Sequence, residues 1–239
     1  MTDEESPDAR SVVDAAERVL AAELSEVPLS RPFQFIVGWT RALMDQSRTI
    51  ATLTSMGLSH AAAPNRRLFA EIALRLTWLY GVPPRERVRA LDSMIQSEAR
   101  SRKAFHNVLN DWGVEHGMNL EEDEALLEAL QLQVAESGFM DEQARKFLAA
   151  ARATENGDGL YIAWREETQY SHAFGALAAA YAPIDGEQLG KGVPPEMDPS
   201  LDTHRMICLS TLMVVFGLLT DGGVPNEVAQ RILNPYIAH

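Results

Sequence analysis

Three polar residues in one segment have the types and spacing of a phosphate-cleaving site that works without a metal: Arg165, Thr168 and His172. With a helical rotation of about 100° per residue, they fall in one narrow sector, together with Tyr161. A histidine can take or give a proton near neutral pH, and an arginine can neutralise the charge of a phosphorane. The pattern predicts a stripe with His172 as general acid and base, Arg165 as phosphate ligand and Thr168 orienting one of them.

A second polar pair precedes this stripe in the chain. Arg67 and Glu71 lie one helical turn apart, and Arg75 follows at the same spacing, in a segment otherwise rich in apolar residues. If exposed, the three form an ordinary salt-bridge ladder along one helix. If buried, they need partners, and Arg165 or His172 would be natural neighbours.

These residues carry a resemblance. The order Trp164-Arg165-x-x-Thr168-x-x-x-His172 resembles the Tyr-Arg-x-x-Ser-x-x-x-His signature of a family of uncharacterised bacterial all-helical proteins, a domain of unknown function. The family's upstream Arg-x-x-x-Glu element is matched by Arg67 and Glu71, and the likeness spans about residues 60–182. Trp replaces Tyr and Thr replaces Ser, and the second change keeps a hydroxyl.

The Arg-x6-His spacing is also similar to the Arg-x(4–6)-His motif of the HEPN superfamily. That resemblance implies a small all-α protein, often a dimer, acting as a metal-independent ribonuclease in toxin–antitoxin or phage-defence systems. The position after the arginine, which is polar in that motif, is occupied here by Glu166.

The elements that must position these residues are all predicted to be helices. The expected fold is an all-α bundle of about eight or nine helices in a single domain, 1–239. Its N-terminal helix is either a peripheral arm or packed on the bundle, and the periodic apolar face favours packing. Apolar periodicity and Pro, Gly and Asn boundaries predict helices over 8–26, 32–57, 64–81, 84–113, 119 onward, 141–156, 158–182, 201–220 and after 225. Residues 183–200, rich in Pro and Gly, are expected to form one long loop.

Two of these helices carry predictions about burial. In 158–182 the core face is expected to be the aromatic and aliphatic side, made by Tyr170, Phe174, Leu177 and Tyr181. The 201–220 helix is apolar on every side from Met206 onward, which predicts a helix buried all round.

Composition excludes several classes of protein. The single cysteine, Cys208, rules out a disulfide framework, and the six histidines lack metal-ligand spacing. No phosphate-binding glycine loop is present, so we expect no metal and no cofactor. The acidic N-terminus predicts no signal peptide, and the longest apolar run is too short to span a bilayer. We therefore expect a cytoplasmic protein without a membrane anchor.

The charge is unevenly distributed. Of 239 residues, 21 are Lys or Arg and 34 are Asp or Glu, which gives a net charge of −13. Residues 31–103 nevertheless carry 12 Lys and Arg against five Asp and Glu, whereas 115–142 carry nine acids and no base. The basic stretch is expected either to meet RNA phosphates or to pair with the acidic helix around 121–128 of the same fold.

Three functions remain open, and with them whether the chain is an enzyme. The first is a HEPN-like ribonuclease or toxin, with RNA as substrate. The second is a non-catalytic helical protein that binds a protein partner or a second copy, with a purely structural Arg-Thr-His stripe. The third is a small-molecule binder that holds its ligand between 64–81 and 158–182, near Arg67 and Arg165. A closed, partly apolar pocket would distinguish this third alternative.

Overall fold

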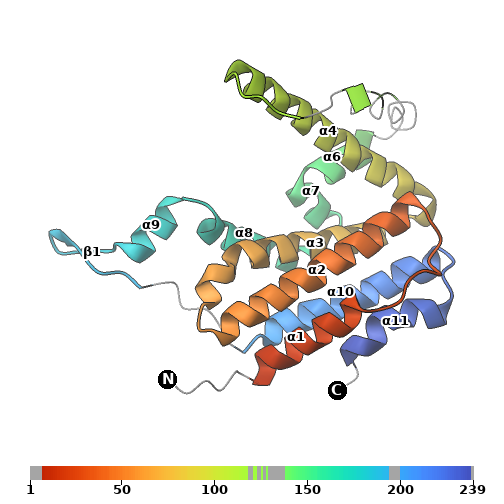
Figure 1. Ribbon diagram of the computed structural model, residues 1–239, viewed down its shortest axis with the longest axis horizontal. Helices are drawn as coiled ribbons and strands as arrows, with labels where there is room; N and C mark the ends of the chain where they lie inside the picture. The colour runs from red at the N-terminus through yellow and green to blue at the C-terminus, as the bar shows by residue number, and fades with distance from the viewer. Residues whose placement is uncertain are drawn as a thin grey trace.

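The computed structural model describes residues 7–117, 121, 122, 125, 128, 138–193 and 200–237. Within this part of the chain the fold is all-α, as predicted, with ten α-helices and one two-stranded hairpin (Figure 1). The elements are α1 (Pro7–Leu20), α2 (Arg31–Ser55), η1 (Ser59–Ala62), α3 (Ala63–Gly81), η2 (Pro84–Glu86), α4 (Arg87–Asp111), α6 (Gly138–Arg145), α7 (Phe147–Arg152), α8 (Gly157–Ser171), α9 (Gly175–Tyr181), β1 (Ile184–Asp185), β2 (Gln188–Leu189), α10 (Asp202–Asp221) and α11 (Asn226–Ile237).

The core lies where α1, α2, α3, α10 and α11 pack together. Helix α2 lies against both α1 and α3, and α10 contacts α2, α3 and α11 (Figure 1). Helix α8 lies along the outer side of α3, and these two helices share the most extensive contact in the fold. The centre is filled by fully buried side chains that include Leu43, Met44, Ile50, Leu76, Leu79, Leu212, Leu218 and Leu219.

Local sequence signals explain where the central helices begin and end. Ser30 caps α2, because its hydroxyl accepts a hydrogen bond from the backbone N–H of Phe33, and Pro32 occupies the first turn. Gly57, with φ of 71°, follows the end of α2. The buried Arg87 covers the C-terminus of α3, where it donates to the carbonyl oxygens of Leu79 and Val82.

Three predicted boundaries were wrong. The N-terminal helix ends at Leu20 rather than near residue 26; it packs in the core through Val12, Ala16 and Val19, the alternative that its apolar face favours. The expected helix over 141–156 is divided into α6 and α7. The expected long loop contains the β1–β2 hairpin, which turns at Gly186 with φ of 61°. Residues 194–199 of that loop, and most of the helix expected from 119, lie outside the described residues.

The predicted helix over 158–182 is also divided, and its core face was assigned to the wrong side. Helix α8 ends at Ser171, and His172 adopts an extended backbone conformation with φ of −127° and ψ of 155°. Phe174 and Tyr181, expected in the core, are exposed. The side of α8 that packs on α3 carries the buried Thr168 instead.

Helix α10 is buried on one side only. Leu212, Val215 and Leu219 are in the core, whereas Met206 is 63% exposed and Met213 is 59% exposed. Burial on all sides was therefore a wrong expectation. By length and composition α10 is able to cross a membrane, but core helices of globular proteins pass the same test, so this is weak evidence.

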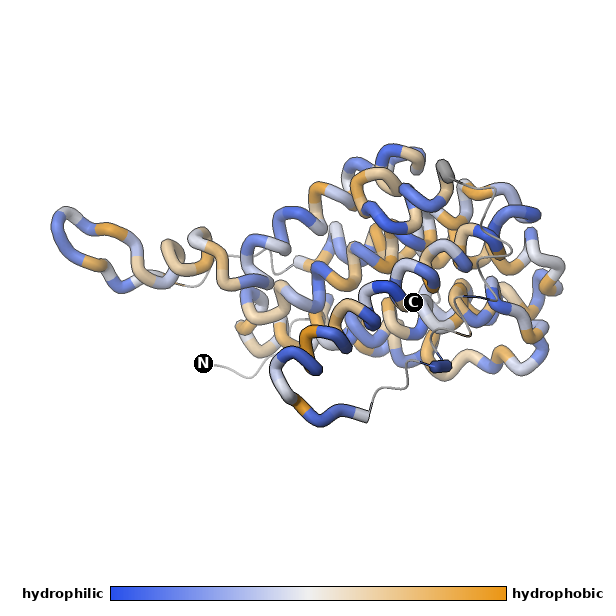
Figure 2. Tube along the Cα trace, turned by 90° about the horizontal axis from the view of Figure 1, so that it is seen from above, coloured by the Kyte–Doolittle hydropathy of each residue, from blue (hydrophilic) through white to orange (hydrophobic). Residues whose placement is uncertain are grey.

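The segment after α8 projects from the body of the protein. Residues 172–193, called the arm below, contain α9 and the hairpin and extend outward from the end of α8 (Figure 1). The arm carries apolar stretches among its polar ones (Figure 2). Ile184 is 84% exposed, Leu189 77% and Val193 74%.

Only part of the basic stretch is used in internal contacts. Arg31 pairs with the buried Asp92, Arg87 pairs with Asp221, and Arg75 is buried with its guanidinium donating to the carbonyl oxygen of Gln143. Other cations of the stretch, Arg85 and Arg100 among them, are exposed, so binding of RNA phosphates stays a prediction. The acidic residues 121–128, expected to pair with this stretch, lie mostly outside the described residues.

Candidate ligand-binding site

The seam between α3 and α8 holds a connected set of polar side chains. The Nε–H of Arg67 donates to Thr168 Oγ1 at 3.2 Å, and that hydroxyl donates to the carbonyl oxygen of Trp164 at 2.7 Å. One turn away, the indole N–H of Trp164 donates to Glu71 Oε2 at 3.2 Å. The guanidinium of Arg67 also lies 5.2 Å from the centre of the Trp164 ring. Arg67, Glu71 and Thr168 are thus brought together, and Trp164 completes the set.

The other predicted site residues do not join this network. Arg165 is exposed, and His172 is exposed beyond the end of α8, with its ring 5.4 Å from that of Phe174. Tyr161 lies in an aromatic cluster, 5.7 Å from the ring of Trp164. Because the helix ends before His172, the continuous stripe of Arg165, Thr168 and His172 expected from helical periodicity does not form.

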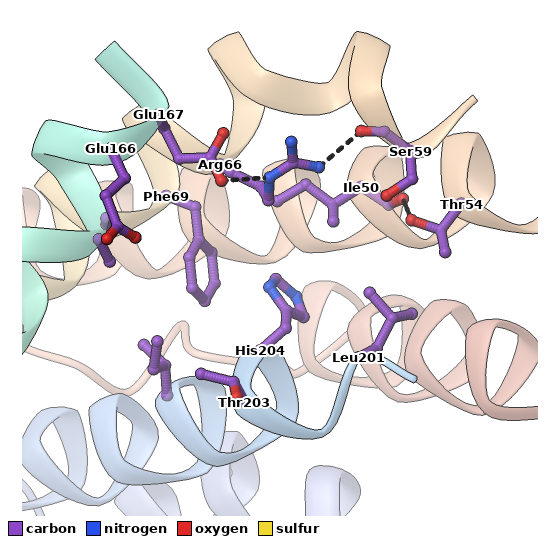
Figure 3. Close-up of a pocket in the computed structure, with 13 residues that line it drawn as sticks. Ile50, Thr54, Ser59, Arg66, Phe69, Glu166, Glu167, Leu201, Thr203 and His204 are labelled. Atoms are coloured by element: carbon purple, nitrogen blue, oxygen red, sulfur yellow. Dashed lines mark hydrogen bonds and ion pairs between the residues drawn. The ribbon is translucent and has the colours of Figure 1, made fainter. Parts of the chain in front are cut away.

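A cavity of about 320 Å³ opens next to this seam, between α2, α3, α8 and α10 (Figure 3). Most of its wall is apolar, and its polar side chains come from α2, η1, α3, α8 and the first turn of α10. The lining residues are Ile50, Thr54, Ser59, Arg66, Phe69, Ala70, Ala163, Glu166, Glu167, Leu201, Thr203, His204 and Ile207.

An ion pair forms one wall of the cavity. Arg66 Nε donates to Glu167 Oε1 at 2.6 Å, and Nη1 donates to the carbonyl oxygen of Ser59 at 2.6 Å. Burial raises the pKa of Glu167, although the guanidinium of Arg66 opposes this shift. Among the described residues, Arg66 Nη2 and Glu167 Oε2 have no hydrogen-bond partner. Nε and Nη1 of Arg66 are therefore already engaged in hydrogen bonds, and the third nitrogen, Nη2, points away from His204 in Figure 3.

His204 forms the opposite wall. Its Nε2 lies 2.7 Å from the hydroxyl oxygen of Ser47, and its ring packs on Phe69 with the ring centres 4.3 Å apart. Burial, together with the nearby positive charge of Arg66, lowers the pKa of His204 to about 4. The imidazole is therefore neutral at pH 7, and it presents an uncharged surface to the cavity.

The contact between Ser47 and His204 has the spacing of a nucleophile and its base. Ser47 is fully buried and is not part of the cavity wall, so a substrate in the cavity cannot reach its hydroxyl. Cys208 lies 3.7 Å from His204 Nε2, and burial raises the pKa of its thiol to about 11. The thiol is therefore protonated at neutral pH, and neither Ser47 nor Cys208 is placed to attack a molecule in the cavity.

The cavity residues were not identified from the sequence. Arg66 was noted only as part of the basic stretch, Glu167 was not singled out, and His204 was considered only for metal spacing. A polar histidine in the apolar segment 201–220 is the one local signal, because a buried imidazole needs a hydrogen-bond partner. Within the described residues, no group of three or more His, Cys, Asp and Glu is arranged to hold a metal ion.

Comparison with known proteins finds no match among family models, curated proteins or solved structures. The two resemblances drawn from the Arg-Thr-His pattern therefore stay predictions, and the argument about function depends on the cavity and its surroundings.

Proposed function

We propose that this helical protein binds a small organic molecule in the cavity between α2, α3, α8 and α10. The single observation that carries the proposal is a largely apolar cavity of about 320 Å³ with a few polar groups in its wall. Ligand pockets typically have volumes of about 300–1,000 Å³ and this kind of lining. The cavity borders α3 and α8, the two helices named by the small-molecule alternative, but Arg67 and Arg165, near which that alternative puts the ligand, are not among the lining residues.

The polar wall supports the same proposal. Arg66 and Glu167 are held by each other and by the Ser59 backbone, and His204 is held by Ser47 and Phe69. These side chains are already fixed in position before any ligand binds, which reduces the entropy lost on binding. The ligand must be small and largely apolar, with one polar group.

A neutral probe tests the proposal. We expect 1-hexanol to bind wild type saturably in isothermal titration calorimetry, since its chain can enter the cavity without any charge. Ala163→Phe, which fills the cavity from α8, should abolish the binding heat, and Ile207→Trp should do so from α10. Ala178→Phe, at an exposed position of α9, is the matched control and should bind as wild type does. Absence of saturable binding to wild type overturns the proposal.

A second candidate function is self-association through the arm. It is favoured by the exposed apolar side chains of the arm, because a two-stranded hairpin has little stability alone in water. The chain itself offers a complementary apolar surface, the exposed side of α10 with Met206 and Met213. The arm projects away from the body, so a second copy is the occupant that brings the two surfaces together (Figures 1 and 2).

A further inference from the structure

We propose that the cavity selects a small organic cation, an alkylamine or arylalkylamine whose ammonium group lies beside Glu166 and Glu167. This inference rests on the proposed function and gives its ligand a chemical class. The apolar part of the ligand would contact Ile50, Leu201 and Ile207.

The charges in the wall carry the argument. The lining contains two carboxylates, of Glu166 and Glu167, against the single guanidinium of Arg66. His204 adds no charge at neutral pH, so the wall has an excess of one negative charge. Arg66 is paired with Glu167, whereas Glu166, an exposed residue that also lines the cavity, forms no hydrogen bond or ion pair with the described residues. An ammonium group supplies the missing positive charge.

The same geometry disfavours an anionic ligand. A carboxylate or phosphate would need Arg66, but Nε and Nη1 are engaged and Nη2 points away from His204 (Figure 3). It would also be repelled by both glutamates of the wall. A neutral alcohol meets no repulsion, but it lacks the charge-assisted hydrogen bond that an ammonium donates to a carboxylate.

The protonation of Glu167 gives the proposal a second readout. Burial raises the pKa of Glu167, and a nearby ammonium opposes that shift by favouring the ionised carboxylate. Amine binding should therefore be accompanied by release of protons at pH values near this raised pKa.

Three six-carbon probes separate the effect of the head-group charge from that of the apolar cavity. Hexylammonium, 1-hexanol and hexanoate each contain six carbon atoms and differ in the head group. We expect hexylammonium to bind about tenfold or more tightly than 1-hexanol, and hexanoate to bind more weakly than either. Glu166→Gln should reduce hexylammonium affinity to near that of 1-hexanol while leaving the affinity for 1-hexanol unchanged. Glu155→Gln, an exposed glutamate before α8, is the matched control.

Non-specific attraction of cations needs its own control, because the chain carries a net charge of −13. Binding inside the cavity should disappear in Ala163→Phe and in Ile207→Trp, whereas surface binding would survive in both. The affinity for hexylammonium should fall as salt is raised, and that for 1-hexanol should not. Equal binding of the three probes, or preference for hexanoate, overturns the inference while leaving the cavity as a binding site. No binding of any probe overturns the proposed function as well.

Discussion

Arg67 and Thr168 meet across the seam between α3 and α8, where the guanidinium Nε–H donates to the threonine hydroxyl at 3.2 Å. The same hydroxyl donates to the carbonyl oxygen of Trp164, so Thr168 is a donor and an acceptor at once. Thr168 belongs to the stripe that suggested catalysis and Arg67 to the supporting Arg-x-x-x-Glu element, yet their contacts join two helices. The cavity lies next to this seam, and Arg66 and Glu167 each precede a seam residue by one position in the same two helices.

Removing the hydroxyl of Thr168 should therefore destabilise the protein. Thr168→Val keeps the shape of the side chain but leaves the half-buried Nε–H of Arg67 without its acceptor, and we expect a loss of about 1 kcal/mol in the free energy of unfolding. Thr168→Ser, which keeps the hydroxyl, should lose less. Thr52→Val removes an exposed hydroxyl that bonds only within α2, and it should change stability by less than about 0.5 kcal/mol. Urea unfolding of the three variants measures the differences, and equal stabilities of Thr168→Val and wild type would contradict the structural role.

Substitutions of Arg165 and His172 test the ribonuclease prediction. Both side chains are exposed and the helix ends between them, so Arg165→Ala and His172→Ala should each change stability by less than about 0.5 kcal/mol. We expect total RNA and growth to be the same after induced expression of wild type and of His172→Ala, because the two groups are not held in one stripe. Growth arrest with RNA fragments in the wild-type strain alone would reinstate catalysis by these residues.

The sequence predicts the helices whose ends are marked by local chemistry. The starts near Pro32 and Pro64 and the stop at Gly57 follow from proline in the first turn and glycine after the last one. The break between α8 and α9 has no such marker on its N-terminal side, and Leu177 and Tyr181 continue the period of Tyr170. Periodicity alone therefore predicts one continuous helix across this break.

The cavity could not be predicted because its residues are brought together by packing. Ser47 and His204 are 157 residues apart, and Arg66 and Glu167 are 101 apart. No spacing within one segment encodes such contacts. The core face of α8 was wrongly predicted for a related reason. Its partner α3 presents Arg67 and Glu71, which need polar partners, and Thr168 and the indole of Trp164 provide them. Aromatic rings such as those of Phe174 and Tyr181 would not.

The ion pair of Arg66 and Glu167 should be coupled to pH. Arg66→Met leaves the largely buried carboxylate of Glu167 without its cation, and we expect a loss of about 1–3 kcal/mol at pH 7. Burial already raises the pKa of Glu167 above its ordinary value, and this variant raises it further. A carboxyl with a raised pKa in the folded state costs stability when pH rises through that pKa, so the loss should shrink on acidification. Chemical denaturation of Arg66→Met between pH 7 and 5 measures this, and Arg66→Met/Glu167→Gln should show no such recovery.

His204 should make the protein less stable in mild acid. Its pKa is about 4 in the folded state against 6.5 ordinarily, because burial and Arg66 disfavour the cation. The free energy of unfolding is therefore at its full value above pH 6.5, and it falls by about 3 kcal/mol in total as the pH decreases to 4. His204→Gln cannot take up this proton and can still bond to Ser47, so it should lose less stability over that range. A titration of the His204 imidazole followed by nuclear magnetic resonance should have its midpoint near 4, and a midpoint near 6.5 would remove the basis of the prediction.

The arm should mediate self-association of the protein. Ile184→Ser together with Leu189→Ser removes two exposed apolar side chains, each able to contribute about 1.5–3 kcal/mol when fully buried, so a dimer held by the arm should weaken at least tenfold. The monomer should keep its stability, because these side chains contribute nothing to the core. Gln188→Ser, a polar exchange on the same hairpin, is the matched control. Since each copy carries a net charge of −13, raising the salt concentration should strengthen the dimer by screening repulsion. Sedimentation equilibrium at low and high salt measures both effects, and a wild-type protein that stays monomeric at every concentration would exclude this role for the arm.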